Sequence, residues 1–89
     1  MPTVKLTKRS VDGLLPPARG QAVLWDTEVR GFGARILPSG TKTFILQYRN
    51  PEGIQRRINI GRYGILTVDQ ARDQAKLHLA SVIQGEDPA

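Results

Sequence analysis

The sequence predicts a small α+β domain, in which a three-stranded antiparallel sheet packs on a C-terminal helix, with a short helix near the N-terminus. Residues 31–61 form short apolar and polar alternations separated by turn residues, which is typical of a β-meander. After residue 64 the apolar spacing changes to three or four, which is typical of an amphipathic helix. The 89 residues have the length of one domain.

The first part of the chain predicts a short helix and an additional strand. Residues 1–6 have no strong pattern, and we expect them to be extended. Thr7 is a typical N-cap residue and predicts a helix to about Leu14, which the two following prolines end. The apolar run at 22–25 fits a short extra strand. We expect Trp25 to anchor the core rather than to stack on bases, because large aromatic side chains are mostly buried in small domains.

Turn residues divide the meander into three strands. Pro-Ser-Gly at 38–40 and Asn-Pro-Glu-Gly at 50–53 fit the turns. Successive side chains of a strand point to opposite faces, so each strand splits into two sets. The apolar set comprises Phe44, Leu46, Tyr48, Ile58 and Ile60. Arg56 shares the spacing of this set, so either it extends past the core from its strand end, or a bulge near the turn changes its face.

The C-terminal helix is predicted over residues 68–84. Thr67 and Gln70 form a capping-box pattern, and Gly85 is the expected stop. The apolar stripe at helical spacing comprises Val68, Ala71, Ala75, Leu79 and Val82. We expect this stripe to cover the apolar face of the sheet, which leaves the opposite face free.

The free face is polar and defines the candidate site. It offers guanidinium, carboxamide and hydroxyl groups, which read base edges and phosphates of DNA. We expect base-edge contacts from Arg35, Gln47, Arg49, Arg57 and Asn59. We expect phosphate contacts from Lys42, Thr43 and Arg62, and Gln55 completes the predicted DNA-binding residues. Ile45 interrupts this face; either it contacts a thymine methyl group, or the N-terminal segment covers it.

The distribution of charge points to a polyanionic partner. Residues 30–62 contain seven basic residues and one acidic residue, 7 − 1 = +6, whereas the whole chain has a formal net charge of +5. Clustered positive charge on a small domain is typical of nucleic-acid binding, although it also serves solubility.

Several classes of protein are disfavoured. The chain has no cysteine and one histidine, His78, so we expect no metal site, no cofactor and no catalytic dyad. No apolar run has the roughly 20 residues that span a bilayer, and the first ten residues lack a signal-peptide core. We therefore expect a soluble, cytoplasmic, non-catalytic domain.

Short motifs in a fixed order resemble the N-terminal domain of prophage and genomic-island integrases of the tyrosine-recombinase family. The motifs are Trp25-Asp26, Gly31-Phe32-Gly33, Pro38-Ser39-Gly40-Thr41-Lys42-Thr43-Phe44, Gly61-Arg62-Tyr63, Ala71-Arg72 and Gly85-Glu86-Asp87-Pro88. The resemblance covers nearly the whole chain. It implies one domain over residues 1–89 that binds arm-type sites in double-stranded DNA through a three-stranded sheet in the major groove.

The resemblance also implies that the core-binding and catalytic domains would follow Asp87-Pro88 and are absent from this chain. Tyr48 and Tyr63 should therefore not act as the recombinase nucleophile, and we expect both to pack. Other integrase subunits or an excisionase are candidate protein partners. The alternative function is a protein-interaction module that uses the C-terminal helix, through Leu77 or Ile83. RNA binding is disfavoured because the polar face has no aromatic pair for stacking.

Overall fold

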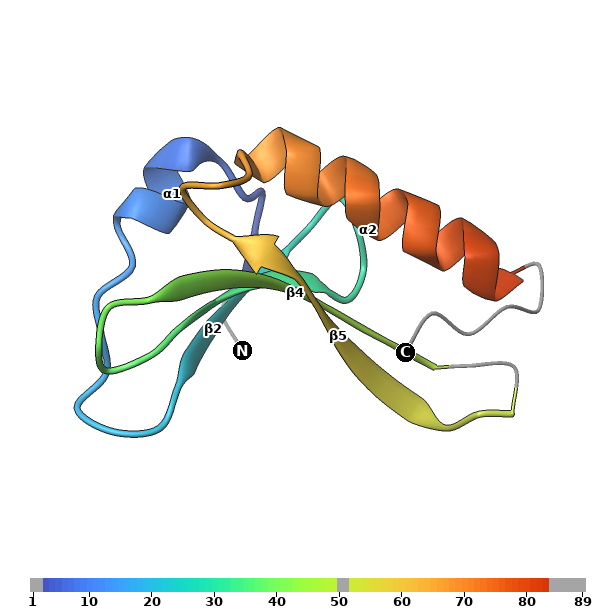
Figure 1. The fold of residues 1–89 in the computed structure, drawn as a ribbon, viewed down its shortest axis with the longest axis horizontal. Coiled ribbons are helices and arrows are strands. Elements are labelled where there is room, and N and C mark those ends of the chain that lie inside the picture. Colours follow the sequence, from blue (N-terminus) through green and yellow to red (C-terminus); the bar gives the residue numbers. More distant parts are fainter. Residues whose placement is uncertain (1–2, 50–51, 84–89) are drawn as a thin grey trace.

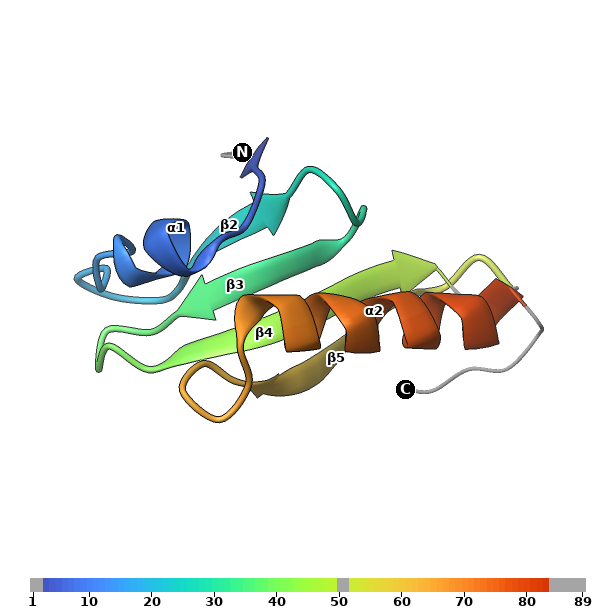
Figure 2. The same ribbon diagram turned by 90° about the horizontal axis from the view of Figure 1, so that it is seen from above.

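The computed structural model describes residues 3–49 and 52–83, which form one mixed sheet with two helices on the same face (Figures 1 and 2). Within these residues the sheet has five strands in the order β1-β2-β3-β4-β5. Their bounds are β1 Thr3–Val4, β2 Ala22–Asp26, β3 Phe32–Ile36, β4 Lys42–Arg49 and β5 Gln55–Arg62. The helices are α1, Lys8–Asp12, and α2, Val68–Ile83.

The predicted α+β class is confirmed, and the sheet is larger than predicted. The meander is β3–β5, all antiparallel, and β2 is the additional strand. β1 was expected only as an extended lead-in, yet it pairs in parallel with β2 through Thr3 and Val4. Two residues are too few to show the alternation that identifies a strand in a sequence. Thr3 and Val4 form a strand because they pair with β2.

Helix α1 begins as predicted and ends earlier. Its N-cap Thr7 accepts a hydrogen bond from the backbone N–H of Ser10 at 3.2 Å, and the Ser10 hydroxyl accepts one from the backbone N–H of Thr7 at 2.8 Å. This reciprocal pair is a capping box. The helix ends at Asp12 rather than at Leu14, because Gly13 is the C-cap.

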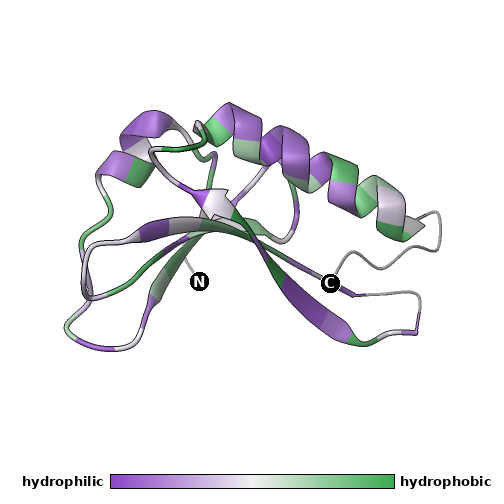
Figure 3. Ribbon diagram, in the orientation of Figure 1, coloured by the Kyte–Doolittle hydropathy of each residue, from purple (hydrophilic) through white to green (hydrophobic). Residues whose placement is uncertain are grey.

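Helix α2 has the predicted capping box and apolar stripe. The Thr67 hydroxyl accepts from the Gln70 N–H at 3.1 Å, and the Gln70 carboxamide accepts from the Thr67 N–H at 3.0 Å. Figure 3 shows hydrophilic and hydrophobic bands along this helix. Ala71 and Ala75 are fully buried, and their small side chains let the helix lie close to the sheet. The predicted helix end at 84–85 lies outside the described residues, as does the side chain of Ile83.

The core lies between the sheet and the helices. From the sheet, Phe44 and Leu46 are fully buried, and Tyr48 is 7 % exposed, as their spacing predicted. Phe44 stacks on Phe32 with ring centroids 5.7 Å apart. Burying each such side chain contributes about 1.5–3 kcal/mol. The predicted members Ile58 and Ile60 are only partly buried and pack at the margin of this cluster.

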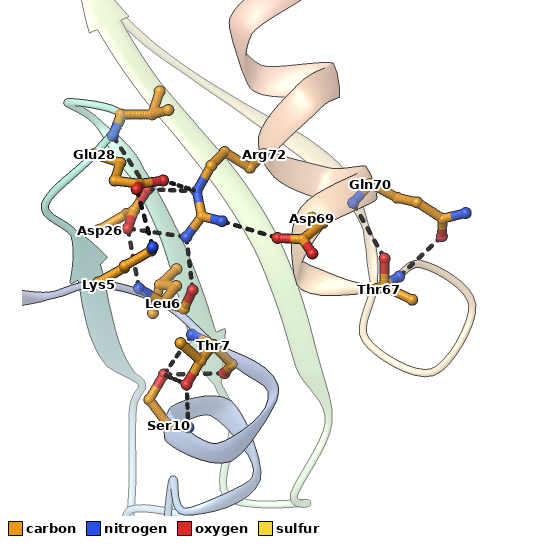
Figure 4. Close-up of polar contacts among 11 residues, drawn as sticks. Lys5, Leu6, Thr7, Ser10, Asp26, Glu28, Thr67, Asp69, Gln70 and Arg72 are labelled. Atoms are coloured by element: carbon orange, nitrogen blue, oxygen red, sulfur yellow. Dashed lines mark hydrogen bonds and ion pairs between the residues drawn. The ribbon is translucent and has the colours of Figure 1, made fainter.

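A buried ion pair joins α2 to the N-terminal half of the chain (Figure 4). Arg72 donates from Nε to Asp26 Oδ2 at 3.0 Å, from Nη2 to Asp26 Oδ1 at 3.2 Å and from Nη2 to the carbonyl of Leu6 at 2.6 Å. The carboxylate of Asp26 also accepts from the backbone N–H groups of Leu6 and Val29. One guanidinium therefore connects α2, the end of β2 and the segment before α1.

The charge state of this pair is fixed by its hydrogen bonds. Burial by itself raises the pKa of Asp26, but the hydrogen bonds from Arg72, Leu6 and Val29 outweigh it and hold that pKa below its ordinary value. The hydrogen bond to Asp26 raises the pKa of Arg72. Both groups are therefore ionised at neutral pH. The motif residues Trp25-Asp26 and Ala71-Arg72 thus include the two partners of a structural contact.

Candidate nucleic-acid interface

Eight of the nine predicted DNA-binding residues share the sheet face that lies opposite the helices. Residues paired directly across antiparallel strands point to the same face, so the register assigns each side chain. The cross-strand partners on this face are Arg35 with Thr43, Thr43 with Arg62, Ile45 with Asn59, Gln47 with Arg57, and Arg49 with Gln55. We call this surface the uncovered face.

Arg62 reaches the uncovered face because of a β-bulge. Phe44 pairs with Gly61 and Ile45 pairs with Asn59, so Ile60 has no position of its own in the ladder. The extra residue changes the face of every position after it, and Arg62 becomes the neighbour of Thr43. The signal in the sequence is Gly61: a Cβ there would lie 2.5 Å from Leu66 Cδ1, so a larger residue would have to displace the end of the Leu66 side chain.

Lys42 is the predicted residue that the structure does not bring to the uncovered face. It pairs with Ile36, which is fully buried on the helix side. Its ammonium group donates to the carbonyl of Asp12 at 3.3 Å and lies 6.0 Å from the ring centroid of Tyr63. Lys42 lies two positions before Phe44 on the same strand, so the alternation that places Phe44 on the helix side also places Lys42 on that side.

The polar residues form two groups along the strands. β3 ends its pairing with β4 at Phe32 and Leu46, so the β4–β5 hairpin continues beyond it as a two-stranded ribbon. The ribbon group comprises Gln47, Arg49, Gln55 and Arg57. The second group lies across all three strands at the other end and comprises Arg35, Thr43 and Arg62, with Asn59 between the two groups. Part of the predicted turn, residues 50–51, lies outside the described residues, while Gly53 has the left-handed φ of +83° that a turn glycine allows.

One side-chain hydrogen bond orders the ribbon group. Arg57 donates from Nη2 to Gln47 Oε1 at 2.7 Å. Arg57 is exposed and Gln47 is half-buried, so the pair remains open to solvent. Cross-strand spacing alone predicted that these residues would be neighbours, whereas the bond between their side chains required the structure.

Arg35 has an unused donor. Its side chain lies between the strand neighbours Val23 and Thr43, and its Nε atom is buried without a hydrogen-bond partner in the described structure. A buried donor without an acceptor costs about 1–3 kcal/mol. An acceptor supplied by a ligand would remove that cost.

Trp25 lies on the uncovered face, so the expectation that it anchors the core is wrong. It pairs with Gly33 and is half-buried, and a Cβ on Gly33 would lie only 2.9 Å from Trp25 Cε3. The indole therefore occupies the space that Gly33 leaves. The signal was Gly33 itself, because a glycine inside a strand indicates close approach by another group.

Ile45 is fully buried on this same face, next to Gly33. In this conformation it has no surface to offer a thymine methyl group. Val23 and Trp25, both from β2, approach the neighbouring Gly33. The N-terminal segment, the other predicted cover, pairs instead at the outer edge of β2.

Arg56 lies across from Tyr48, and the ladder between them and the turn is regular. Of the two alternatives for Arg56, the structure favours the exposed position at the strand end, on the helix side. The bulge occurs near Ile60, at the other end of β5.

The two tyrosines pack, as expected. Tyr48 belongs to the core cluster, and Tyr63 contacts Phe44 edge-on with centroids 5.9 Å apart. The Tyr63 hydroxyl donates to Asp12 Oδ1 at 2.7 Å, and this hydrogen bond raises the pKa of Tyr63.

Acidic side chains are separated from the described strand positions of the uncovered face, whereas basic side chains lie on both sides of the sheet. The described strand positions of the uncovered face include Arg35, Arg49, Arg57 and Arg62 and no acidic residue. The acidic residues Asp12, Asp26 and Asp69 make their contacts on the helix side. Such a separation gives one face a positive potential, which attracts polyanions.

Other kinds of site were sought in the part of the chain that the structure describes. It holds no group of three or more His, Cys, Asp or Glu side chains that fits a metal ion. None of its helices is long and apolar enough to cross a membrane.

Comparison with known families agrees with the geometry. The model of a family described as "Arm DNA-binding domain" matches residues 6–89. None of the curated proteins matches the chain. The family match covers both helices and strands β2 to β5, and so includes the whole uncovered face.

Proposed function

Because the chain belongs to the arm DNA-binding domain family, we propose that its uncovered face binds arm-type sites in double-stranded DNA for a tyrosine-recombinase integrase of a prophage or genomic island. A domain of this family binds DNA and is itself non-catalytic. In this proposal the domain holds the recombinase at sites beside the crossover point, and so supports integration and excision. The core-binding and catalytic domains belong to the remainder of the parent protein.

The observation that carries the proposal is the composition of the uncovered face. Eight predicted DNA-contacting side chains gather there without an acidic neighbour on the described strands. Arginine, glutamine and asparagine are the side chains that make bidentate contacts with base edges, and arginine also binds phosphate. The helices cover only the other face, so these groups are available to a ligand (Figure 1).

The shape of the ribbon suits the major groove. The groove is about 12 Å wide and admits a two-stranded β-ribbon, whose strands lie about 4.8 Å apart. We propose that the ribbon group, Gln47, Arg49, Gln55 and Arg57, reads base edges. Residue 43 lies four positions from residue 47, about 13 Å along the strand. Arg35, Thr43 and Arg62 would then lie where the groove edge presents phosphates, so we assign Arg35 to phosphate rather than to the base edge expected from the sequence. Asn59 would contact bases between the two groups.

A second candidate is contact with another integrase subunit or an excisionase through α2. Leu77 favours it, because its side chain is 62 % exposed on the helix. The two functions use opposite sides of the domain and are compatible. DNA binding is the stronger candidate because it uses many oriented polar groups rather than one exposed leucine.

An NMR titration of the chain with duplex DNA from the attachment region of its host element tests the proposal. A scrambled duplex and two salt concentrations provide the comparison. We expect the largest amide shifts on the uncovered face and tighter binding of the authentic duplex, with affinity falling steeply as salt rises. Shifts confined to residues 68–82, or the absence of binding at low salt, would refute the proposal.

Adjacent arginines of β5 provide a matched pair of variants. Arg57 lies on the uncovered face and Arg56 on the other, and both are exposed. Arg57→Gln should weaken duplex binding, whereas Arg56→Gln removes the same charge and should change it little. Equal losses would show that net charge, and not this face, determines binding.

A further inference from the structure

The geometry points to guanine, rather than adenine, as the base that the Gln47–Arg57 pair reads. This inference rests on the proposed function and assigns a specificity to one part of the interface. Glutamine by itself is suited to adenine, because its carboxamide both donates and accepts. The hydrogen bond between the two side chains changes what Gln47 can offer.

The orientation of the Gln47 carboxamide is determined by its partner. A guanidinium group has N–H donors and no acceptor, so the atom that faces Arg57 Nη2 at 2.7 Å must be the carbonyl oxygen of Gln47. The Gln47 Nε2 group, which carries two N–H donors, is then the end that remains available. The contact also brings a positive charge beside the carbonyl oxygen.

The pair consequently presents donors. Nε2 of Gln47 and the N–H groups of Arg57 that are not directed at Gln47 belong to directly paired positions of the ribbon. An adenine would direct its N6 amino group, a donor, toward N–H donors and toward a carbonyl oxygen that already accepts one hydrogen bond from the guanidinium and has one lone pair left. A guanine directs two acceptors, O6 and N7, toward the same groups. Cytosine presents a donor at N4 and is disfavoured for the same reason as adenine.

The next pair along the ribbon provides an internal control. Arg49 and Gln55 are also cross-strand partners, one arginine and one glutamine, but no hydrogen bond joins their side chains in the described structure. In this pair the arginine is on β4 and the glutamine on β5, the reverse of the Gln47–Arg57 pair. A specificity that arises from the hydrogen bond should therefore be found at the Gln47–Arg57 pair and not at this one.

Selection from a duplex library with a randomised site, performed on the wild-type chain and on Gln47→Glu, tests the inference. The glutamate keeps its contact with Arg57 and replaces the Nε2 donor by an acceptor oxygen. At one base position we expect the wild type to prefer guanine by roughly tenfold to hundredfold, and Gln47→Glu to shift the preference toward cytosine. Gln74→Glu makes the same change of charge at an exposed position of α2, away from the uncovered face, and should leave that base preference unaltered.

A second measurement needs no variant of the protein. Replacing the selected guanine by 7-deazaguanine removes the N7 acceptor and should weaken wild-type binding by about tenfold, whereas the same replacement outside the site should have no effect. An affected position that prefers adenine, or full binding of the 7-deazaguanine duplex, would overturn the inference while leaving the proposed function intact. Failure of the wild-type chain to enrich any duplex sequence would overturn both.

Discussion

Replacing Arg72 by methionine should destabilise the domain more than any other single change of a charged side chain considered above. The side chain of Asp26 is fully buried and that of Arg72 is 6 % exposed. In Arg72→Met, the carboxylate of Asp26 keeps only its two backbone donors, and the carbonyl of Leu6 loses its 2.6 Å contact. Methionine fills much of the volume, so the loss reports on charge and hydrogen bonding.

The magnitude follows from these contacts. Removing one partner of a buried ion pair costs about 3–5 kcal/mol. Domains have about 5–15 kcal/mol of stability in total, so the loss is a large fraction. With a urea m-value of about 2 kcal/mol/M, a loss of about 4 kcal/mol lowers the urea midpoint by about 2 M. Circular dichroism during urea titration measures this shift directly.

A control variant uses one of the two further carboxylates on the same guanidinium, those of Asp69 and Glu28. Arg72 Nη1 lies 3.1 Å from Asp69 Oδ1, but the Asp69 side chain is 92 % exposed. Asp69→Asn should therefore cost less than about 1 kcal/mol, as exposed ion pairs do. A loss below about 1 kcal/mol for Arg72→Met, or equal losses for the two variants, would contradict the assignment of the buried network as a principal contributor to stability.

Three further predictions use the same structure. Gly31→Ala should lower the free energy of unfolding in urea much more than Gly53→Ala. Both glycines have left-handed φ values, +87° and +83°, but of the two only a Cβ at Gly31 would meet a backbone oxygen, that of Gln47 at 2.0 Å. Equal losses would contradict this. The slope of log affinity against log salt should be about −1.8 for Arg35 and Arg62, the two arginines proposed to contact phosphates, and Arg62→Gln should reduce its size by about 0.9 while Lys42→Gln leaves it unchanged. The folded pKa of Asp26 lies below the unfolded value of about 3.9. The contribution of the Asp26 carboxylate to the free energy of unfolding is therefore complete above about pH 4 and is lost as pH falls through the folded pKa. Asp26→Asn should remove this part of the pH dependence of stability.

The elements that the sequence predicted correctly are those whose signals are local. The Thr67–Gln70 capping box and the stripe containing Ala71 and Ala75 lie within a few residues of one another, and the structure has both. The alternation in β4 likewise separated Phe44 from Thr43 without knowledge of the partner strands. Local signals of this kind depend on the period of one element, which the amino-acid sequence contains.

The errors arise where a position depends on a second segment. Trp25 has the large aromatic side chain that is typical of a core residue, and only its pairing with Gly33 shows that it lies on the uncovered face. Strand β1 exists because β2 offers it an edge. Lys42 is a different case, because its spacing with Phe44, which is a local signal, already places it on the helix side. For Trp25 and for β1, the pairing with a neighbouring strand determined the position, and the local sequence did not contain that information.

The bulge at Ile60 connects the core to the candidate interface. Without it, a regular ladder would pair Arg62 with Lys42 on the helix side and turn Tyr63 toward the uncovered face. With it, Ile60 and Gly61 both lie over the core, Tyr63 reaches Phe44 and Asp12, and Arg62 joins Thr43. The extra residue Ile60 therefore both lets Tyr63 pack in the core and places Arg62 on the uncovered face. Because the two requirements share that residue, a change that regularises β5 by altering its register would remove Arg62 from the interface and Tyr63 from the core together.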